Sequence, residues 1–234
     1  MNSVAVGLQV RLDSLRLPGK ALLPLGDRTV IEHAMAALTN VPGADLYILT
    51  DESSVERLTP PAEMYGFTVM AGPRDDVLRR YATLAETSGA DTLIRATGDN
   101  PLVSPRMAGR AVQLRGETGA DLCAFDNLPL GTGVEVLASE AIARADAAAA
   151  RRDEREHVTL HLYRHRDSYR IDRRPAPPEA TMAEGRVTLD TREDYELIRE
   201  VFRRKQGGTP IEVESVIDAL RSIVAEGRVA SIRG

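Results

Sequence analysis

The residues best suited to chemistry lie in one short stretch near the start of the chain, residues 9–20 (QVRLDSLRLPGK). Arg11, Arg16 and Lys20 place three cations there, and a Pro-Gly pair predicts a turn. The stretch follows an apolar run, residues 4–8, that predicts a buried strand. Cations and free backbone N–H groups after such a strand are suited to hold a polyphosphate. The same residues would also suit a solvated surface turn.

The choice of lysine at the end of this loop favours the phosphate-binding interpretation. The chain contains thirty lysines and arginines, but only Lys20 and Lys205 are lysines. A lysine ammonium is a compact charge that fits between phosphate oxygens, where the planar fork of arginine would not.

Two aspartates are candidates for binding Mg²⁺. Asp99 follows a predicted strand, residues 92–97, at the sheet edge where ligands bind in open α/β proteins. Asp190 follows a second predicted strand, residues 187–189. Mg²⁺ is bound by one or two carboxylates together with phosphate oxygens and water. Each aspartate also has a structural alternative, because Asp99 could bond its own turn and Asp190 could cap a helix.

Strand and helix patterns alternate through the first two-thirds of the chain, which predicts an α/β fold with a mostly parallel sheet flanked by helices. Strands are predicted over residues 4–8, 45–50, 67–71, 92–97 and 120–125, and helices over 29–38, from 53, from Asp75 or Asp76 to Gly89, and from Ser104-Pro105.

The regular alternation of strand and helix patterns changes beyond residue 126. The sequence predicts a short strand at 134–137, a helix at 139–150, and a charged segment at 151–156 that leads into a HVTLHLY helix. An extended proline connector at 175–178 and a strand at 186–189 follow. Two helices are predicted at the end, from 192 to about Lys205 and over 213–226, and the second is expected to pack against the sheet. We expect a single domain over residues 1–234, with 126–182 as an excursion.

Composition limits the classes of partner. The formal net charge of -5 argues against nucleic acid as the main ligand. The single cysteine, Cys123, lies in an apolar run and is expected in the core rather than as a nucleophile. No signal peptide or long apolar segment is apparent, so we expect a cytoplasmic protein without membrane contact.

With these pieces in place, the sequence resembles the cytidylyltransferase family that includes CMP-sugar-acid synthetases, and within it the SpsF-like branch of spore coat polysaccharide biosynthesis. The matching residues run in order over nearly the whole chain: Gln9, Arg11, Ser14, Arg16 and Leu17-Pro18-Gly19-Lys20; Gly72, Asp75-Asp76-Val77-Leu78 and Tyr81; Arg95 and Thr97-Gly98-Asp99-Asn100-Pro101-Leu102; Gly133-Val134-Glu135-Val136; Glu156-His157-Val158-Thr159; Leu189-Asp190-Thr191 and Glu193-Asp194. One residue departs from the pattern, since Asp13 stands where glycine is frequent in the family.

The resemblance implies a GT-A-like, Rossmann-related fold and the transfer of CMP from CTP to a sugar, sugar acid or related acid, with release of pyrophosphate. A phosphonate acceptor is an alternative. Arg16 and Lys20 would stabilise the leaving pyrophosphate, and Asp99 with Asp190 would hold Mg²⁺ near the α-phosphate. Arg16, Lys20 and Asp99 are therefore the catalytic candidates. The resemblance also suggests a homodimer formed through the excursion.

The remaining candidates divide between the two substrates. The expected nucleotide-binding residues are Gln9, Arg11, Ser14, Arg16, Lys20, Asp75, Asp76, Thr97 and Gly98, and the expected acceptor-binding residues are Arg95, Asn100, Glu135 and His157. For Asp75 and Asp76 the pattern favours helix caps over recognition of the base, and for His157 it favours a core histidine, whereas Arg95 suits a buried ion pair and an acceptor ligand equally.

Two other functions share these features. A GT-A glycosyltransferase has the same fold, but it usually carries a D-x-D pair where this chain has Asp99-Asn100-Pro101. A non-catalytic homologue that binds nucleotide is the other alternative, which Asp13 slightly favours.

Overall fold

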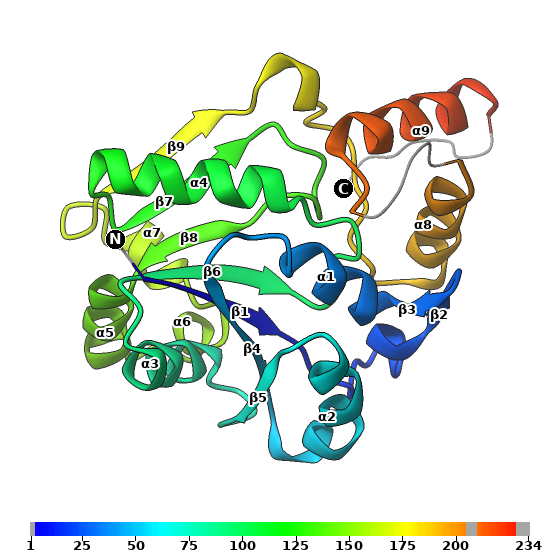
Figure 1. Cartoon of the computed structure of the whole chain (residues 1–234). Coiled ribbons are helices and arrows are strands. Elements are labelled where there is room, and N and C mark those ends of the chain that lie inside the picture. Colours follow the sequence, from blue (N-terminus) through cyan, green and yellow to red (C-terminus); the bar gives the residue numbers. More distant parts are fainter. Residues whose placement is uncertain (1–2, 205–209, 228–234) are drawn as a thin grey trace.

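One seven-stranded sheet organises the computed structural model, which describes residues 3–204 and 210–227 (Figure 1). The strands lie in the order β5 (Thr68–Ala71), β4 (Ala44–Thr50), β1 (Val4–Gln9), β6 (Thr92–Thr97), β8 (Glu135–Ala138), β7 (Leu122–Asp126) and β9 (Ile171–Pro175). All neighbouring pairs are parallel except the two that involve β8. The expected mixed, mostly parallel sheet is confirmed.

The register of the central strands brings the predicted site residues to one edge. Gln9 at the end of β1 lies beside Thr97 at the end of β6. Because β8 runs the opposite way, its first residue, Glu135, lies beside Arg95 near the same edge. This antiparallel strand comes from the predicted excursion, so residues 126–182 build part of the sheet itself.

Helices cover both faces of the sheet (Figure 1). Apolar residues of α1, α2 and α4 share one core cluster with β1, β4 and β6, whereas α3, α5 and α7 share a second cluster on the other side. The helices that flank the sheet are α1 (Val30–Leu38), α2 (Val55–Met64), α3 (Val77–Ser88), α4 (Pro105–Thr118), α5 (Ser139–Ala148), α6 (Arg152–Glu156) and α7 (Leu160–Arg164). Short pieces complete this part: β2 (Pro24–Leu25), β3 (Arg28–Thr29) and the 3-10 turns η1 (Lys20–Leu22) and η2 (Glu52–Ser54).

The predicted helix boundaries agree with their caps. The Ser104 hydroxyl accepts a hydrogen bond from the Met107 amide at the start of α4, and the Asp76 carboxylate accepts one from the Arg79 amide at the start of α3. Helix α3 ends at Gly89, whose positive φ of 62° suits a residue without a side chain.

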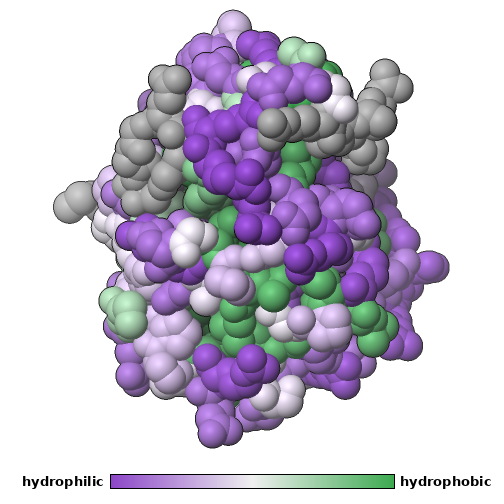
Figure 2. Space-filling view, turned by 90° about the vertical axis from the view of Figure 1, so that its right-hand side faces the viewer, coloured by the Kyte–Doolittle hydropathy of each residue, from purple (hydrophilic) through white to green (hydrophobic). Residues whose placement is uncertain are grey.

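The last two helices form a separate layer at the end of the sheet. The expectation that the final helix packs against the sheet is wrong: α9 (Val213–Ala225) packs on α8 (Arg192–Arg204) and on η3 (Pro178–Ala180), in a core cluster that also takes in Leu25, Val30 and Met107. Figure 2 shows the face on this side of the molecule, where hydrophilic residues surround hydrophobic ones gathered near the middle. Lys205, the expected end of α8, lies outside the described residues.

Two features of the segment after residue 170 differ from expectation. Residues 186–189 do not form a strand; they are extended and make one bridge, between Arg186 and Leu130. Conversely, β9 was not predicted, because its sequence IDRRP is charged and ends in proline. Proline is tolerated there because β9 is an edge strand that pairs only with β7.

Along residues 3–204 and 210–227, no helix combines the length and apolarity needed to cross a membrane.

Candidate active site

Two cavities open at the carboxyl ends of the central strands and share a wall. The first, which we call the loop cavity, has a volume of about 630 Å³ and is lined by the first loop and by residues around 74–80 and 156–157. The second, the sheet cavity, has a volume of about 860 Å³ and lies over β6, β8 and β7. Thr97, Asp99 and Asp190 line both cavities.

A buried lysine joins the two aspartates in the shared wall. The ammonium nitrogen of Lys20 lies 2.9 Å from Asp99 Oδ2 and 3.0 Å from Asp190 Oδ1, and it donates a hydrogen bond of 2.6 Å to the Leu189 carbonyl. Asp190 also pairs with Arg16 at 2.8 Å and with Arg186 at 2.7 Å. The loop and the segment before α8 are thus brought together by charge.

Backbone contacts explain how Asp190 reaches Asp99 across 91 positions of sequence. The Leu189 amide donates to the Asp99 carbonyl at 2.9 Å, which places the extended segment beside the end of β6. Of the predicted Asp190-Thr191 cap, only Thr191 caps the following helix: its hydroxyl accepts from the Asp194 amide at 3.2 Å, and the Asp194 carboxylate accepts from the Asp190 and Thr191 amides at 2.9 and 2.8 Å. The Asp190 side chain instead pairs with Lys20, Arg16 and Arg186.

The two carboxylates differ in how readily they hold a negative charge. Burial raises the pKa of Asp99 above its ordinary value, and the charge of Lys20 only partly offsets that effect. For Asp190 burial acts in the same direction, but the hydrogen bond and charge of Lys20, with Arg16 and Arg186, outweigh it and lower the pKa.

This donor set fits a divalent cation. Two carboxylates converge on a single compact positive charge, the Lys20 ammonium, which already lies where a cation is stabilised. A Mg²⁺ ion bound by Asp99 and Asp190 would compete with Lys20 for these oxygens.

The mouth of the loop cavity is a network of paired charges that accounts for Asp13. The Asp13 carboxylate contacts Arg74 and lies 3.6 Å from Arg11. Arg11 in turn donates to the Arg74 carbonyl at 3.0 Å and lies 3.3 Å from Asp75. Because Asp13 is compensated by two arginines, its charge does not leave the loop electrostatically unfavourable for an anion.

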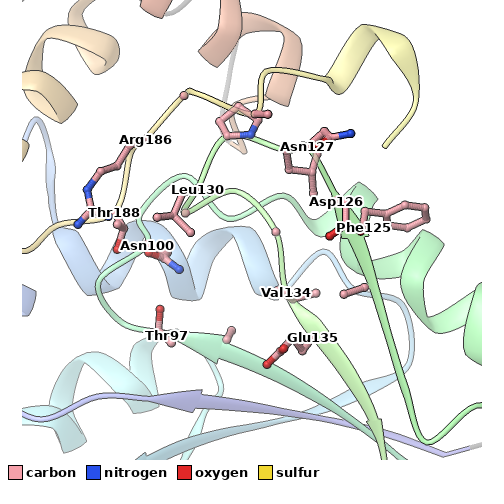
Figure 3. Close-up of a pocket in the computed structure, with 18 of the residues that line it drawn as sticks. Thr97, Asn100, Phe125, Asp126, Asn127, Leu130, Val134, Glu135, Arg186 and Thr188 are labelled. Atoms are coloured by element: carbon pink, nitrogen blue, oxygen red, sulfur yellow. The ribbon is translucent and has the colours of Figure 1, made fainter. Parts of the chain in front are cut away.

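Figure 3 shows the sheet cavity, with Thr97 and Glu135 on the sheet side and Asn127, Arg186 and Thr188 on the opposite wall. Glu135 is the most heavily bonded group of its floor. Its carboxylate accepts from Arg95 at 2.8 Å, Tyr163 at 2.8 Å and Thr159 at 3.0 Å. Arg95 is therefore both an ion-pair partner and a lining residue, so the two interpretations of it are compatible.

Asn100 provides a polar group that the described residues leave unsatisfied. Its Oδ1 atom is buried and has no hydrogen-bond partner there, and the residue lines the sheet cavity. A buried amide oxygen without a donor is costly, so this atom is suited to accept a hydrogen bond from a ligand.

The structure gathers most of the predicted residues around the two cavities. Gln9, Arg11, Ser14, Arg16, Lys20, Asp75 and Thr97 line the loop cavity, and Arg95, Asn100 and Glu135 line the sheet cavity.

Three predicted residues are placed differently. His157, expected in the acceptor pocket or the core, is exposed and lines the loop cavity. Asp76 lines neither cavity; its predicted role as a helix cap is confirmed, since one carboxylate oxygen caps α3 and the other pairs with Arg155 at 2.6 Å. Gly98 also lines neither, and a side chain there would meet Val10 at 2.8 Å, so the residue is needed for strand packing.

Four arginines that line these cavities were not predicted from the sequence: Arg74, Arg80, Arg173 and Arg186. Arg80 is buried under the loop cavity, where it donates to the Leu49 carbonyl at 3.1 Å and its Nε has no partner within the described chain. Its position three residues after Val77, on the apolar face of α3, could have indicated it. Arg186 pairs with Asp190 at 2.7 Å although the segment between them is not helical, so the four-residue spacing gave no signal in the sequence.

Cys123 is buried, and burial raises the pKa of its thiol, so the expectation of a core residue is confirmed.

An α/β sheet with strand-end carboxylates and a cationic loop defines the nucleotide-binding α/β class. A sequence model of the cytidylyltransferase family matches residues 5–217, and the chain belongs to that family. The predicted family and nucleotidyltransferase activity are thereby confirmed, and the glycosyltransferase alternative is set aside.

Individual relatives agree with this assignment. The chain is 31% identical over 227 residues to the spore coat polysaccharide biosynthesis protein SpsF of Bacillus subtilis (strain 168), covering 94% of this chain and 95% of the relative. It is similar in fold to a cytidylyltransferase from Leptospira borgpetersenii serovar Hardjo-bovis, with a TM-score of 0.84 at 23% identity over 100% of this chain and 99% of the other. It is also similar to CMP:2-keto-3-deoxy-manno-octonic acid synthetase complexed with CTP, with a TM-score of 0.65 at 15% identity over 86% and 98%.

Proposed function

We propose that this protein transfers CMP from CTP to a small acceptor in a Mg²⁺-dependent reaction that releases pyrophosphate. The acceptor is a sugar, sugar acid or related acid used in cell-surface polysaccharide or related biosynthesis. The main support is the wall that the two cavities share, where Asp99 and Asp190 line both the loop cavity and the sheet cavity. Two substrates held on either side of this wall would meet at the atoms that react.

The charge balance of the loop cavity supports a requirement for a divalent cation. The lining contains five cationic residues, Arg11, Arg16, Lys20, Arg74 and Arg80, and also five acidic ones, Asp13, Asp75, Asp99, Glu156 and Asp190. A triphosphate carries several negative charges, and a lining without net charge does not compensate them. A divalent cation that enters with the nucleotide supplies the missing charge.

The chain's own residues then have distinct roles. Arg16 and Lys20, with the backbone amides of the first loop, stabilise the negative charge that grows on the leaving pyrophosphate. Asp99 and Asp190 would hold the cation, which would supply Lewis-acid polarisation of the α-phosphate. An acceptor oxygen in the sheet cavity forms the new bond to the α-phosphorus while the bond to the pyrophosphate oxygen breaks.

The sheet cavity is suited to orient a polyhydroxylated acceptor. Asn100 Oδ1 is available as a hydrogen-bond acceptor, and the Glu135 carboxylate is fixed by three donors. Residues held this firmly can position a substrate at little further cost in entropy.

The organisation of the chain is part of the proposal. Residues 1–234 act as a single nucleotidyltransferase domain, in which residues 126–182 supply β8 and part of the sheet cavity. Homodimer formation through this segment stays a prediction, to be measured by light scattering during size-exclusion chromatography.

The test is nucleotide-dependent pyrophosphate release. We expect pyrophosphate to be released from CTP, and not from ATP, GTP or UTP, when Mg²⁺ and an acceptor are both present. Without an acceptor, CTP together with Mg²⁺ is expected to raise the melting temperature. Acceptors are screened as matched sets of neutral sugars, sugar acids and phosphonates. Stabilisation by another triphosphate in preference to CTP would contradict the proposal.

A further inference from the structure

A cluster of nitrogen and oxygen ligands lies in the α6–α7 hairpin, apart from the two cavities of the active site. It consists of Glu154 on α6, His161 on α7 and His165 at the end of α7. One ligand atom from each residue can be chosen so that all lie within 4.8 Å of one another. Two of the four histidines of the chain are gathered here, one helical turn apart.

The cluster is built around a buried carboxylate. Glu154 and His161 are both buried, and His161 Nδ1 lies 3.1 Å from Glu154 Oε2. His165 Nε2 lies 3.9 Å from Glu154 Oε1, and the two imidazole rings are 4.3 Å apart. A buried carboxylate therefore lies within reach of both imidazole rings.

Space and access are also present. A cavity of about 450 Å³ opens beside the cluster and is lined by Glu154, His161, His165, Ser168 and Tyr169 among others. The side chain of His165 is 50% exposed, so it lies on an entry path and is free to move. Zinc bonds of about 2.0–2.2 Å place ligand atoms about 3.4 Å apart, and a shift of about 1 Å by His165 would reach that spacing.

We propose that Glu154, His161 and His165 form a site for a divalent transition-metal ion such as Zn²⁺, which ties α6 to α7. Two histidines and one glutamate with an open fourth position are a recurrent ligand set for zinc. Mg²⁺ is not the expected ion, because it prefers oxygen ligands such as Asp99 and Asp190.

One neighbour competes with the metal. Arg164 donates to Glu154 Oε1 at 3.2 Å and therefore compensates the buried carboxylate when no metal is bound. Arg164 also pairs with Asp153 at 2.7 Å and would keep that partner if the metal displaced it from Glu154.

The site would act on the active site through the hairpin that carries it. His157, between α6 and α7, lines the loop cavity, and Thr159 and Tyr163 bond Glu135 in the sheet cavity. A metal that fixes α6 against α7 therefore stabilises residues that face both substrates.

The experiment is calorimetric titration of Zn²⁺ into the full chain, free of any purification tag, with excess Mg²⁺ to occupy the Asp99–Asp190 pair. Co²⁺ replaces Zn²⁺ in a parallel series that reports the ligand field by visible absorption. We expect a single equivalent to bind and to raise the melting temperature.

Three variants decide the result. His165→Ala, at a half-exposed position that does not endanger folding, is expected to weaken Zn²⁺ binding at least about 10-fold and to abolish the Co²⁺ bands. Arg164→Gln removes the competitor and is expected to tighten binding, whereas His157→Ala, an exposed histidine outside the cluster, leaves it unchanged. Absence of saturable binding, equal affinity in His165→Ala, or weaker binding in Arg164→Gln would each overturn the proposal.

Discussion

The loop cavity and the sheet cavity are assembled in opposite ways. The loop cavity takes Gln9, Arg11, Ser14, Arg16 and Lys20 from one continuous stretch. The sheet cavity takes its residues from segments around 95–100, 124–135, 173 and 183–190, which only the sheet brings together. A cavity whose lining comes largely from one loop can be specified locally, whereas a cavity built from several strands depends on strand order and register.

The two cavities also differ in how their charges are arranged. In the loop cavity, arginine and aspartate side chains pair at the mouth, and Lys20 lies buried between Asp99 and Asp190. In the sheet cavity, a single carboxylate, Glu135, gathers several donors on the floor. The first arrangement is suited to exchange partners when a polyanion and a cation enter, and the second to remain fixed.

The largest loss of activity is expected from a change in the wall that the two cavities share, because such a change affects both cavities. Asp99→Asn removes a carboxylate that faces both compartments, and we expect kcat to fall about 1,000-fold because cation-mediated stabilisation of several kcal/mol is lost. Pyrophosphate release is measured over a range of Mg²⁺ concentrations. Asp45→Asn, on an exposed position of β4, is the matched control. A variant that kept its Mg²⁺ dependence would show that the cation is bound elsewhere.

Lys20 belongs to the loop cavity but is held by the shared aspartates. We expect Lys20→Ala to lower kcat/KM for CTP about 100-fold, because a charged donor to the leaving group is lost. The same variant should bind Mg²⁺ more tightly in the absence of nucleotide, since Lys20 competes for the oxygens of Asp99 and Asp190. Both are measured by steady-state kinetics and Mg²⁺ titration. Unchanged Mg²⁺ affinity would mean that lysine and metal occupy separate positions.

Two variants test whether each cavity binds a different substrate. We expect Glu135→Gln to raise the KM for the acceptor about 10-fold while the KM for CTP stays constant, because charged hydrogen bonds of about 1.5–3 kcal/mol are weakened on the sheet side. Arg16→Ala is expected to show the reverse pattern. Two-substrate kinetics measure both, and a common change in both KM values would contradict separate sites.

The smallest effect concerns pH. Burial raises the pKa of Asp99 above the ordinary 3.8, so its carboxylate takes up a proton at a higher pH than an exposed aspartate does. A protonated Asp99 does not bind a cation, so kcat/KM should fall as the pH drops through this raised pKa. Because Mg²⁺ binds only the ionised form, a higher Mg²⁺ concentration should move the acid limb to lower pH. If the acid limb of the pH profile did not shift with the Mg²⁺ concentration, the titrating group would be one other than Asp99.

Local sequence alone predicted a large part of this protein. The strands that end at Gln9 and Thr97, the helix cap at Ser104 and the cationic loop were found because each depends on a pattern within a few residues. The edge strand β9 and the layer formed by α8 and α9 were not, because charged or amphipathic segments do not indicate which surface they will meet.

Tertiary structure decided the rest. The sequence determined that Lys20, Asp99 and Asp190 are candidates for binding phosphate and metal, but only the fold showed that the lysine lies between the two aspartates. Asp76 and His157 illustrate the same limit, because Asp76 pairs with an arginine 79 positions away and His157 lines a cavity formed mostly by residues distant from it in sequence. Residue types and spacing determine which chemistry is available, whereas the pairing of charges across the sheet edge determines which groups are free to perform it.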